Sequence, residues 1–92
     1  SYATLKEIAS VMKENSSLRV KIVGHTDSDG DANTNMSLSR QRAAAVKLVL
    51  SNEFGIAENR METDGKGSSQ PAATNNTNEG KALNRRVEFI KL

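Results

Sequence analysis

The stretch LRVKIVGHTDSDGDANTN, from Leu18 to Asn35, joins an alternating apolar run to an acidic loop. Apolar and basic residues alternate strictly from Leu18 to Ile22, which is typical of a half-buried β-strand. The loop that follows holds three aspartates, and the only histidine of the chain, His25, stands near its start. A polar loop at the end of a strand is a candidate for metal binding, for catalysis or for recognition of a charged ligand.

The segments on either side of this stretch predict helices. Apolar residues at helical spacing from Leu5 to Met12 predict an amphipathic helix before the strand. A long helix is predicted after the loop, with Ser37 as its N-cap and Phe54 at its end. Gly55 then stands in the left-handed position that terminates many helices. Weaker patterns predict the remaining elements: strands over 61–64 and 86–90, and a short helical turn over 77–83.

These elements predict an α/β (α+β) fold, a two-layer sandwich in which the helices pack on one face of a small mixed sheet. Two strands joined through a helix pair in parallel by a crossover, which puts both long helices on the same face. The alternating strands fit a sheet that is covered on that face only. With 92 residues and no internal linker, the chain is expected to form a single domain.

The composition excludes several classes of function. The formal net charge is only +2, and acidic and basic residues are mixed along the chain. Two phenylalanines and one tyrosine provide no stacking platform, so nucleic-acid binding is not expected. The absence of cysteine excludes disulfides, thiolate catalysis and cysteine-ligated zinc. No apolar run approaches membrane-spanning length.

The acidic loop makes a poor calcium site. If Asp27 is taken as position 1 of an EF-hand loop, Asp29 and Asp31 fit positions 3 and 5. However, Gly30 falls at position 4 instead of 6, and Leu38 occupies position 12, where a bidentate glutamate is required. The sequence therefore predicts no metal site.

Hydrolase chemistry is also poorly supported. His25 is the only imidazole available as a base, and no nucleophile elbow is present. The run Gly65-Lys66-Gly67 lacks the spacing of a phosphate-binding loop. A lone histidine at a strand end is more often structural than catalytic, so a structural hydrogen-bonding role is the preferred interpretation of His25.

Recognition of a dipolar ligand has better geometry. Asp27 follows the carboxyl end of a strand, where α/β sheets bind their ligands. Residues 35–38 lie around the predicted start of the next helix, where free N–H groups favour a carboxylate, and Leu38 and Arg42 share a face there. Asp27 and Arg42 would flank one crevice, suited to an ammonium and a carboxylate respectively. Spacing alone leaves two alternatives open: the two residues pair with each other, or Arg42 faces solvent.

Several runs of this sequence resemble the OmpA-like C-terminal domain. The pattern T-D-x-x-G-x4-N-x2-L-S-x2-R-A is intact from Thr26 to Ala43, and N-x-T-x2-G-x3-N-R-R-V is intact from Asn75 to Val87. The family includes peptidoglycan-associated lipoproteins and the flagellar stator protein MotB. The resemblance covers about residues 18–91 and is carried by these runs: GHTDSDG, the asparagine at 35, LSRQRA, GKGSSQP and NNTNEGKALNRRVEF.

The resemblance implies a non-catalytic domain, without a cofactor, that binds peptidoglycan and anchors the outer membrane or an envelope complex to the cell wall. It implies that Asp27 holds the ammonium of the diaminopimelate residue of the stem peptide and that Arg42 holds its carboxylate. Thr26, Asn35 and Leu38 match positions that line the same site. The alternative is a structural or protein–protein interaction module of the envelope that binds no such ligand.

The resemblance carries further expectations about the surroundings of the domain. The N-R-R run, Asn84 to Arg86, is interpreted mainly as structural, with an arginine that lends positive potential or pairs with an acidic residue of the fold. Family members have one more strand and a loop before the first helix, so the domain is expected to be N-terminally truncated. The missing strand would leave a sheet edge uncovered, and an uncovered edge favours association, so a dimer is a possible state of the domain. The expected location is the periplasm of a Gram-negative bacterium, with attachment through an upstream segment to the outer membrane, or to the inner membrane in a motor-type protein.

Overall fold

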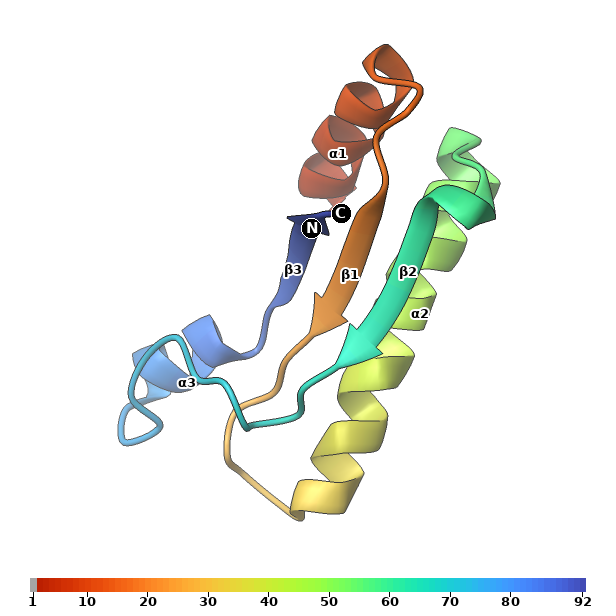
Figure 1. Ribbon diagram of the computed structural model, residues 1–92. Helices are drawn as coiled ribbons and strands as arrows, with labels where there is room; N and C mark the ends of the chain where they lie inside the picture. Colours follow the sequence, from red (N-terminus) through yellow and green to blue (C-terminus); the bar gives the residue numbers. More distant parts are fainter. Residues whose placement is uncertain (1) are drawn as a thin grey trace.

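The computed structural model describes residues 2–92, which form three helices, one 3-10 turn and a three-stranded sheet (Figure 1). The strand order is β2-β1-β3, with β1 parallel to β2 and antiparallel to β3. The predicted small mixed sheet is therefore confirmed. The elements follow one another in this order: α1 (Tyr2–Glu14), β1 (Val20–Gly24), α2 (Ala32–Phe54), η1 (Glu58–Arg60), β2 (Met61–Gly65), α3 (Asn78–Asn84) and β3 (Val87–Lys91).

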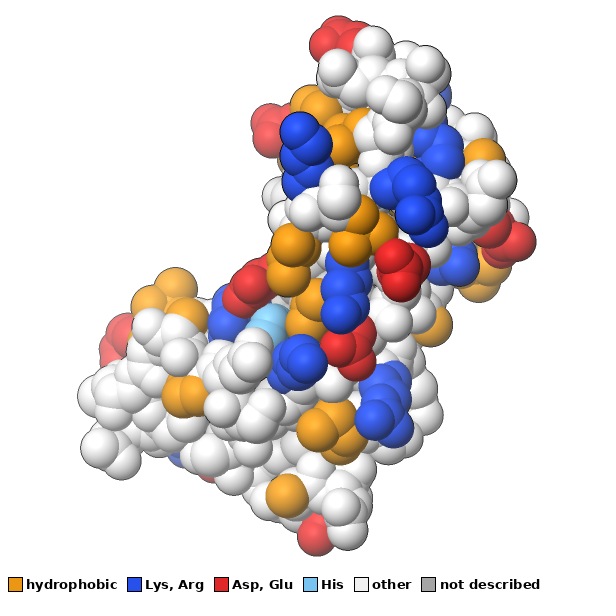
Figure 2. Space-filling model, viewed as in Figure 1, with side chains coloured by type: hydrophobic (Ala, Val, Ile, Leu, Met, Phe, Trp, Pro, Cys, Tyr) orange, Lys and Arg blue, Asp and Glu red, His pale blue; other side chains and the backbone are white. Residues whose placement is uncertain are grey.

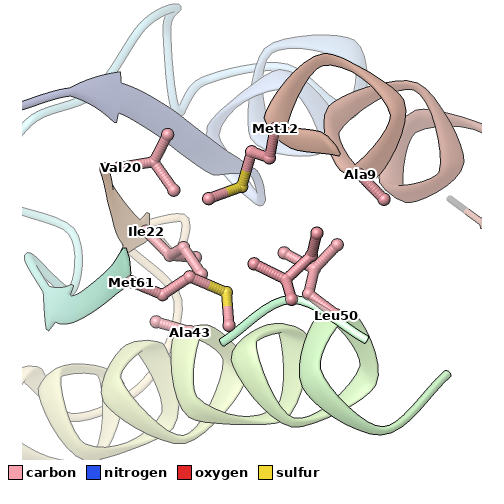
Figure 3. Packing of buried hydrophobic residues seen from close by; sticks show 8 residues of the cluster. Ala9, Met12, Val20, Ile22, Ala43, Leu50 and Met61 are labelled. Carbon is pink, nitrogen blue, oxygen red and sulfur yellow. The ribbon is translucent and has the colours of Figure 1, made fainter. Parts of the chain in front are cut away.

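The two long helices, α1 and α2, pack on one face of the sheet, and the core lies between them and the strands (Figure 3). Met12 of α1, Leu50 of α2 and Ile22 of β1 are fully buried there. The predicted two-layer sandwich is thus confirmed, whereas α3 lies beyond the strand ends (Figure 1). None of the helices within residues 2–92 combines the length and the apolarity that crossing a bilayer requires.

The other face of the sheet carries charged side chains of both signs (Figure 2). Asp64 of β2 lies 3.6 Å from the Lys21 ammonium and 3.2 Å from the Lys66 ammonium. At the start of β3, the guanidinium of the preceding Arg86 lies 2.6 Å from the Glu88 carboxylate. Partly exposed ion pairs of this kind contribute little to stability, so this face is expected to stabilise the fold less than the core on the opposite side.

The long helix begins earlier than the sequence predicted. Its N-cap is Asp31, whose Oδ2 accepts a hydrogen bond of 3.0 Å from the Thr34 amide, and the helix starts at Ala32. The prediction of Ser37 as N-cap was wrong because it followed apolar periodicity, and the first turn of α2 presents little apolar surface. The predicted end is confirmed, since Gly55 adopts φ 71° and its amide bonds to carbonyls of the last turn.

The strands and the short helix lie within two residues of their predicted bounds, whereas α1 begins three residues before the predicted Leu5 and ends two residues after Met12. The predicted strand 18–22 is observed at 20–24, because β1 is the central strand and stays paired on both sides as far as Gly24. The strand at 61–65 and the last strand, at 87–91, are close to their predicted positions. The predicted helical turn is α3, capped by the Thr77 hydroxyl, which accepts a hydrogen bond of 3.0 Å from the Gly80 amide.

Helix α2 passes the ends of β1 and β2 at very close range. A Cβ atom on Gly24 would overlap the Ser39 carbonyl, and one on Gly65 would overlap the Ser39 side chain. The buried Ser39 hydroxyl donates to the Met36 carbonyl and accepts a hydrogen bond of 2.9 Å from the Gly67 amide. The loops that leave β1 and β2 are therefore held against α2, at the end of the sheet where α3 also lies (Figure 1).

Candidate functional site

The three aspartates of the loop between β1 and α2 have three different partners. Asp27 Oδ2 accepts a hydrogen bond of 2.5 Å from Arg85 Nη1, and Asp29 Oδ1 lies 3.2 Å from the Lys81 ammonium. Asp31 caps α2. The carboxylates are thus directed to separate places, and no group of three potential metal ligands comes together within residues 2–92.

Asp27 is an ionised carboxylate, and each of its two oxygens accepts a hydrogen bond from the protein. Its Oδ1 accepts a hydrogen bond of 3.0 Å from the Asp29 amide, and its side chain is only 10% exposed. The hydrogen bond from Arg85, together with that amide, holds the pKa of the Asp27 carboxyl below its ordinary value. Asp27 therefore carries a full negative charge at neutral pH.

Arg42 lines a hollow of about 490 Å³ bordered by α1, α2 and β3. Three arginines and no acidic residue take part in its wall. Within residues 2–92, the Arg42 guanidinium forms no hydrogen bond and no ion pair. The hollow is therefore lined by cationic and apolar side chains, and its arginines suit a ligand with a carboxylate. Its lining residues are Thr4, Leu5, Arg42, Val46, Arg85, Arg86, Val87 and Phe89.

Arg85 connects Asp27 to this hollow. Asp27 does not line the hollow itself, but its partner Arg85 does. The two alternatives left open by the sequence are decided in part, because Asp27 pairs with Arg85 and not with Arg42. The structure thus brings Arg42 and Arg85 together in one hollow, and the Asp27 carboxylate contacts Arg85 outside the lining of this hollow.

Thr26 and Asn35 hold the loop from within instead of facing the hollow. The Thr26 hydroxyl donates to the Asp27 carbonyl over 2.9 Å, and the Asn35 amide group donates to the Asp29 carbonyl over 2.8 Å. Both side chains are buried. Their contacts fix the backbone that carries Asp27, so they position the carboxylate.

Leu38 does not line the hollow that Arg42 lines, although the two residues lie one turn apart on α2. It is 36% exposed and lines a separate shallow depression on the outer side of α2, together with Ser37 and Gln41. The expectation of free amides at 35–38 was wrong, because α2 starts before them and the Asn35 amide already bonds to the Asp31 carbonyl. Neither the Leu38 side chain nor the backbone of residues 35–38 lines the hollow that contains Arg42.

The N-R-R run contributes more to this region than its spacing suggested. Asn84 is completely buried, and its Oδ1 accepts hydrogen bonds from the Ala72 and Ala73 amides. Arg86 pairs with Glu88, and Arg85 pairs with Asp27, as expected of an arginine that meets an acidic residue of the fold. The second intact motif was the signal for these residues, but no spacing rule identifies Asp27 as the partner.

His25, the residue that follows β1, is 1% exposed, and its small visible area is pale blue in Figure 2. Its Nε2 atom lies 3.2 Å from Glu88 Oε1, but neither ring nitrogen forms a hydrogen bond with any described residue. Burial, and then the charge of Arg86, lower the pKa of His25. His25 is therefore a neutral, packed imidazole, structural but without the hydrogen bond expected of it.

Comparison with known proteins places this arrangement in context. Residues 1–85 match the family model described as "OmpA family". Outer membrane porin F of Pseudomonas aeruginosa is 48% identical over 88 residues, which are 96% of this chain and 25% of that protein. The peptidoglycan-binding protein ArfA of Mycobacterium bovis is 42% identical over 89 residues, which are 97% of this chain and 27% of that protein.

A solved structure shares the fold over nearly the whole chain. The peptidoglycan-associated lipoprotein from Burkholderia pseudomallei superposes with a TM-score of 0.90 at 30% sequence identity, covering 98% of this chain and 75% of that one. The chain spans only about a quarter of the length of the two curated relatives, which are therefore much larger proteins that contain a similar domain.

Proposed function

Because this chain belongs to the OmpA family, we propose that it binds peptidoglycan without covalent attachment and so anchors the protein of which it is part to the cell wall. The domain is not an enzyme, since the OmpA-like domains of this family are structural anchoring modules. The observation that carries the proposal is that the ionised Asp27 carboxylate lies next to a hollow lined by arginines and contacts one of them, Arg85.

The ligand group is the diaminopimelate residue of the stem peptide. Its free amino-acid centre bears an ammonium and a carboxylate on one carbon, and these two charges match Asp27 and Arg42. A charge-assisted hydrogen bond from the ammonium to Asp27 and a forked contact from Arg42 to the carboxylate fix the orientation of this group. Thr26 and Asn35 support this geometry through the loop backbone.

Anchoring requires only modest affinity at each site. A few charge-assisted contacts must offset the entropy that the ligand loses on binding, so a free amino acid is expected to bind weakly. The cell wall offers many identical stem peptides, and several domains attached to one wall gain from avidity. The location that follows is the periplasm, and the parent protein holds either membrane to the wall.

Pull-down by purified sacculi tests the site. We expect Asp27→Asn and Arg42→Ala to lower the bound fraction at least tenfold, because each removes one of the two charges that hold the ligand. Arg40→Ala is the matched control, since Arg40 is an exposed arginine of α2 that does not line the hollow. Circular dichroism establishes that each variant is folded. Full binding by both site variants would reject the assignment and favour an interaction module that does not use this site.

A further inference from the structure

In the free domain little of the Asp27 carboxylate is open to a ligand, because the Arg85 guanidinium covers one of its oxygens. Both carboxylate oxygens already accept hydrogen bonds, one from the Asp29 amide and one from the Arg85 guanidinium, and only a tenth of the side chain is exposed. The amide is part of the loop backbone and cannot leave. Arg85 is therefore the only one of these two donors that a ligand ammonium can replace.

Arg85 is suited to leave Asp27 without disturbing the fold. Its side chain is 46% exposed, and its backbone is fixed independently, as the C-cap of α3, by a hydrogen bond from its amide to the Lys81 carbonyl. The guanidinium also lines the hollow with Arg42, whose own guanidinium has no partner within residues 2–92. When Arg85 leaves Asp27, it remains in a hollow whose lining contains no other carboxylate.

We infer that Arg85 is the specificity-determining residue of this site and acts by exchange. In the free domain its guanidinium occupies Asp27; on binding, the ligand ammonium takes its place, and the ligand carboxylate receives the released guanidinium beside Arg42. The inference rests on the proposed function. It adds that Arg85 blocks the site until a suitable ligand arrives.

Counting ion pairs shows which ligands the exchange selects. A dipolar ligand replaces the one pair between Asp27 and Arg85 with a pair at each of its two ends. A ligand that has the ammonium but lacks the carboxylate merely substitutes one pair for another and leaves Arg85 next to Arg42 with no anion between them. Such a ligand gains nothing to offset its loss of freedom on binding. The free domain therefore discriminates against ammonium-only ligands.

Two soluble stem tripeptides that differ only in this carboxylate test the inference. The first is L-Ala-γ-D-Glu-meso-diaminopimelate, and the second has L-lysine in place of diaminopimelate. In calorimetric titration we expect the wild-type domain to bind the first at least tenfold more tightly than the second. In Arg85→Gln we expect this ratio to fall at least about threefold below the wild-type ratio, because the lysine peptide no longer has to displace a guanidinium and binds more tightly than it does to the wild type, while Arg42 still favours the diaminopimelate peptide.

Lys81→Gln is the matched control, since it removes an equal charge from the same helix, where Lys81 pairs with Asp29 and does not line the hollow. Its ratio should stay within about twofold of the wild-type ratio. A wild-type ratio retained in Arg85→Gln, or a folded Arg85→Gln that binds neither peptide, would overturn the exchange. If the wild-type domain binds neither peptide nor sacculi, the proposed function itself fails, which is a different result.

Discussion

Asp27 is charged although only a tenth of its side chain is exposed, because a backbone amide and the Arg85 guanidinium donate hydrogen bonds to its oxygens. A carboxylate held in this way does not need a ligand in order to be stable, and it is ready for one only if a donor moves. The proposed site therefore depends as much on Arg85, which the sequence indicated mainly as structural, as on Asp27 and Arg42, the two residues that the family motif emphasises.

Arg85→Gln should raise the pKa of Asp27 toward its ordinary value of 3.8, because the hydrogen bond from Arg85 is the largest cause of its depression. A carboxyl with a depressed pKa contributes stability above its unfolded pKa and loses it as the pH falls through the folded pKa. Carboxyl-carbon NMR titration below pH 5 measures the change directly. Lys81→Gln should move the same pKa less, since Lys81 is the smallest of the contributions.

His25 should make the domain sensitive to mild acid. Its folded pKa lies below the ordinary 6.5, so the unfolded chain takes up the proton first, and the stabilisation present at higher pH is lost as the pH falls below about 6.5. We expect the urea midpoint to fall between pH 7.5 and pH 5 in the wild type. His25→Gln should remove most of this slope, whatever its absolute stability. An equal slope in both proteins would assign the acid sensitivity to another group.

At the scale of elements, α2 determines where the loops of the site lie. Its inner face carries asparagine, serine and alanine at 35, 39 and 43, and only then the large Leu50, so its first half packs very close to the strand ends. The small residues of the helix thus contact the glycines at the strand ends, as Ser39 does with Gly24 and Gly65. This contact brings the loops after β1 and β2 to a common place.

Gly24→Ala should destabilise the domain by about 1–3 kcal/mol, because its Cβ would meet the Ser39 main-chain carbonyl, which no change of rotamer can move. Urea unfolding at pH 7.5 measures the loss. Ser37→Ala, on the exposed side of the same helix, is the control and should change stability by no more than about 0.5 kcal/mol. A fully stable Gly24→Ala would mean that α2 lies farther from β1 than the structure shows.

The sequence predicts the elements of this fold better than their contacts. The sequence pattern located β2 to within one residue, although only Met61 and Gly65 of that strand are buried. The start of α2 was missed because the prediction followed the apolar pattern, which begins several residues after the true N-cap, Asp31. For the proposed site, the motif supplied the candidate residues, but the pair of Asp27 with Arg85 joins positions 58 apart, and no local pattern encodes it.

At the scale of the whole molecule, the loop after β1, the loop after β2 and helix α3 all lie at one end of the sheet (Figure 1). These segments have little apolar surface of their own, and hydrogen bonds from a few buried polar side chains hold them together. Asn84 is the centre of this network. It bonds to the loop at Ala72 and Ala73, and to Asn75, whose side chain also accepts from the Ser28 amide beside Asp27. Asn84 thereby links three segments that are distant in sequence.

Asn84→Ala should therefore cost about 1–3 kcal/mol, because the Ala72 and Ala73 amides lose a common acceptor. The loss should be local: amide hydrogen exchange should accelerate at Ala72 and Ala73, while the Val23 amide in the central strand keeps most of its protection. Asn76→Ala, in the exposed part of the same loop, is the matched control and should change neither stability nor exchange. Sacculus binding should weaken in Asn84→Ala more than in Asn76→Ala, since Arg85, adjacent to Asn84, and the loop that carries Asp27 both rest on this network. Unchanged exchange at Ala72 and Ala73 would show that the loop is held by other contacts, and that the site does not depend on Asn84.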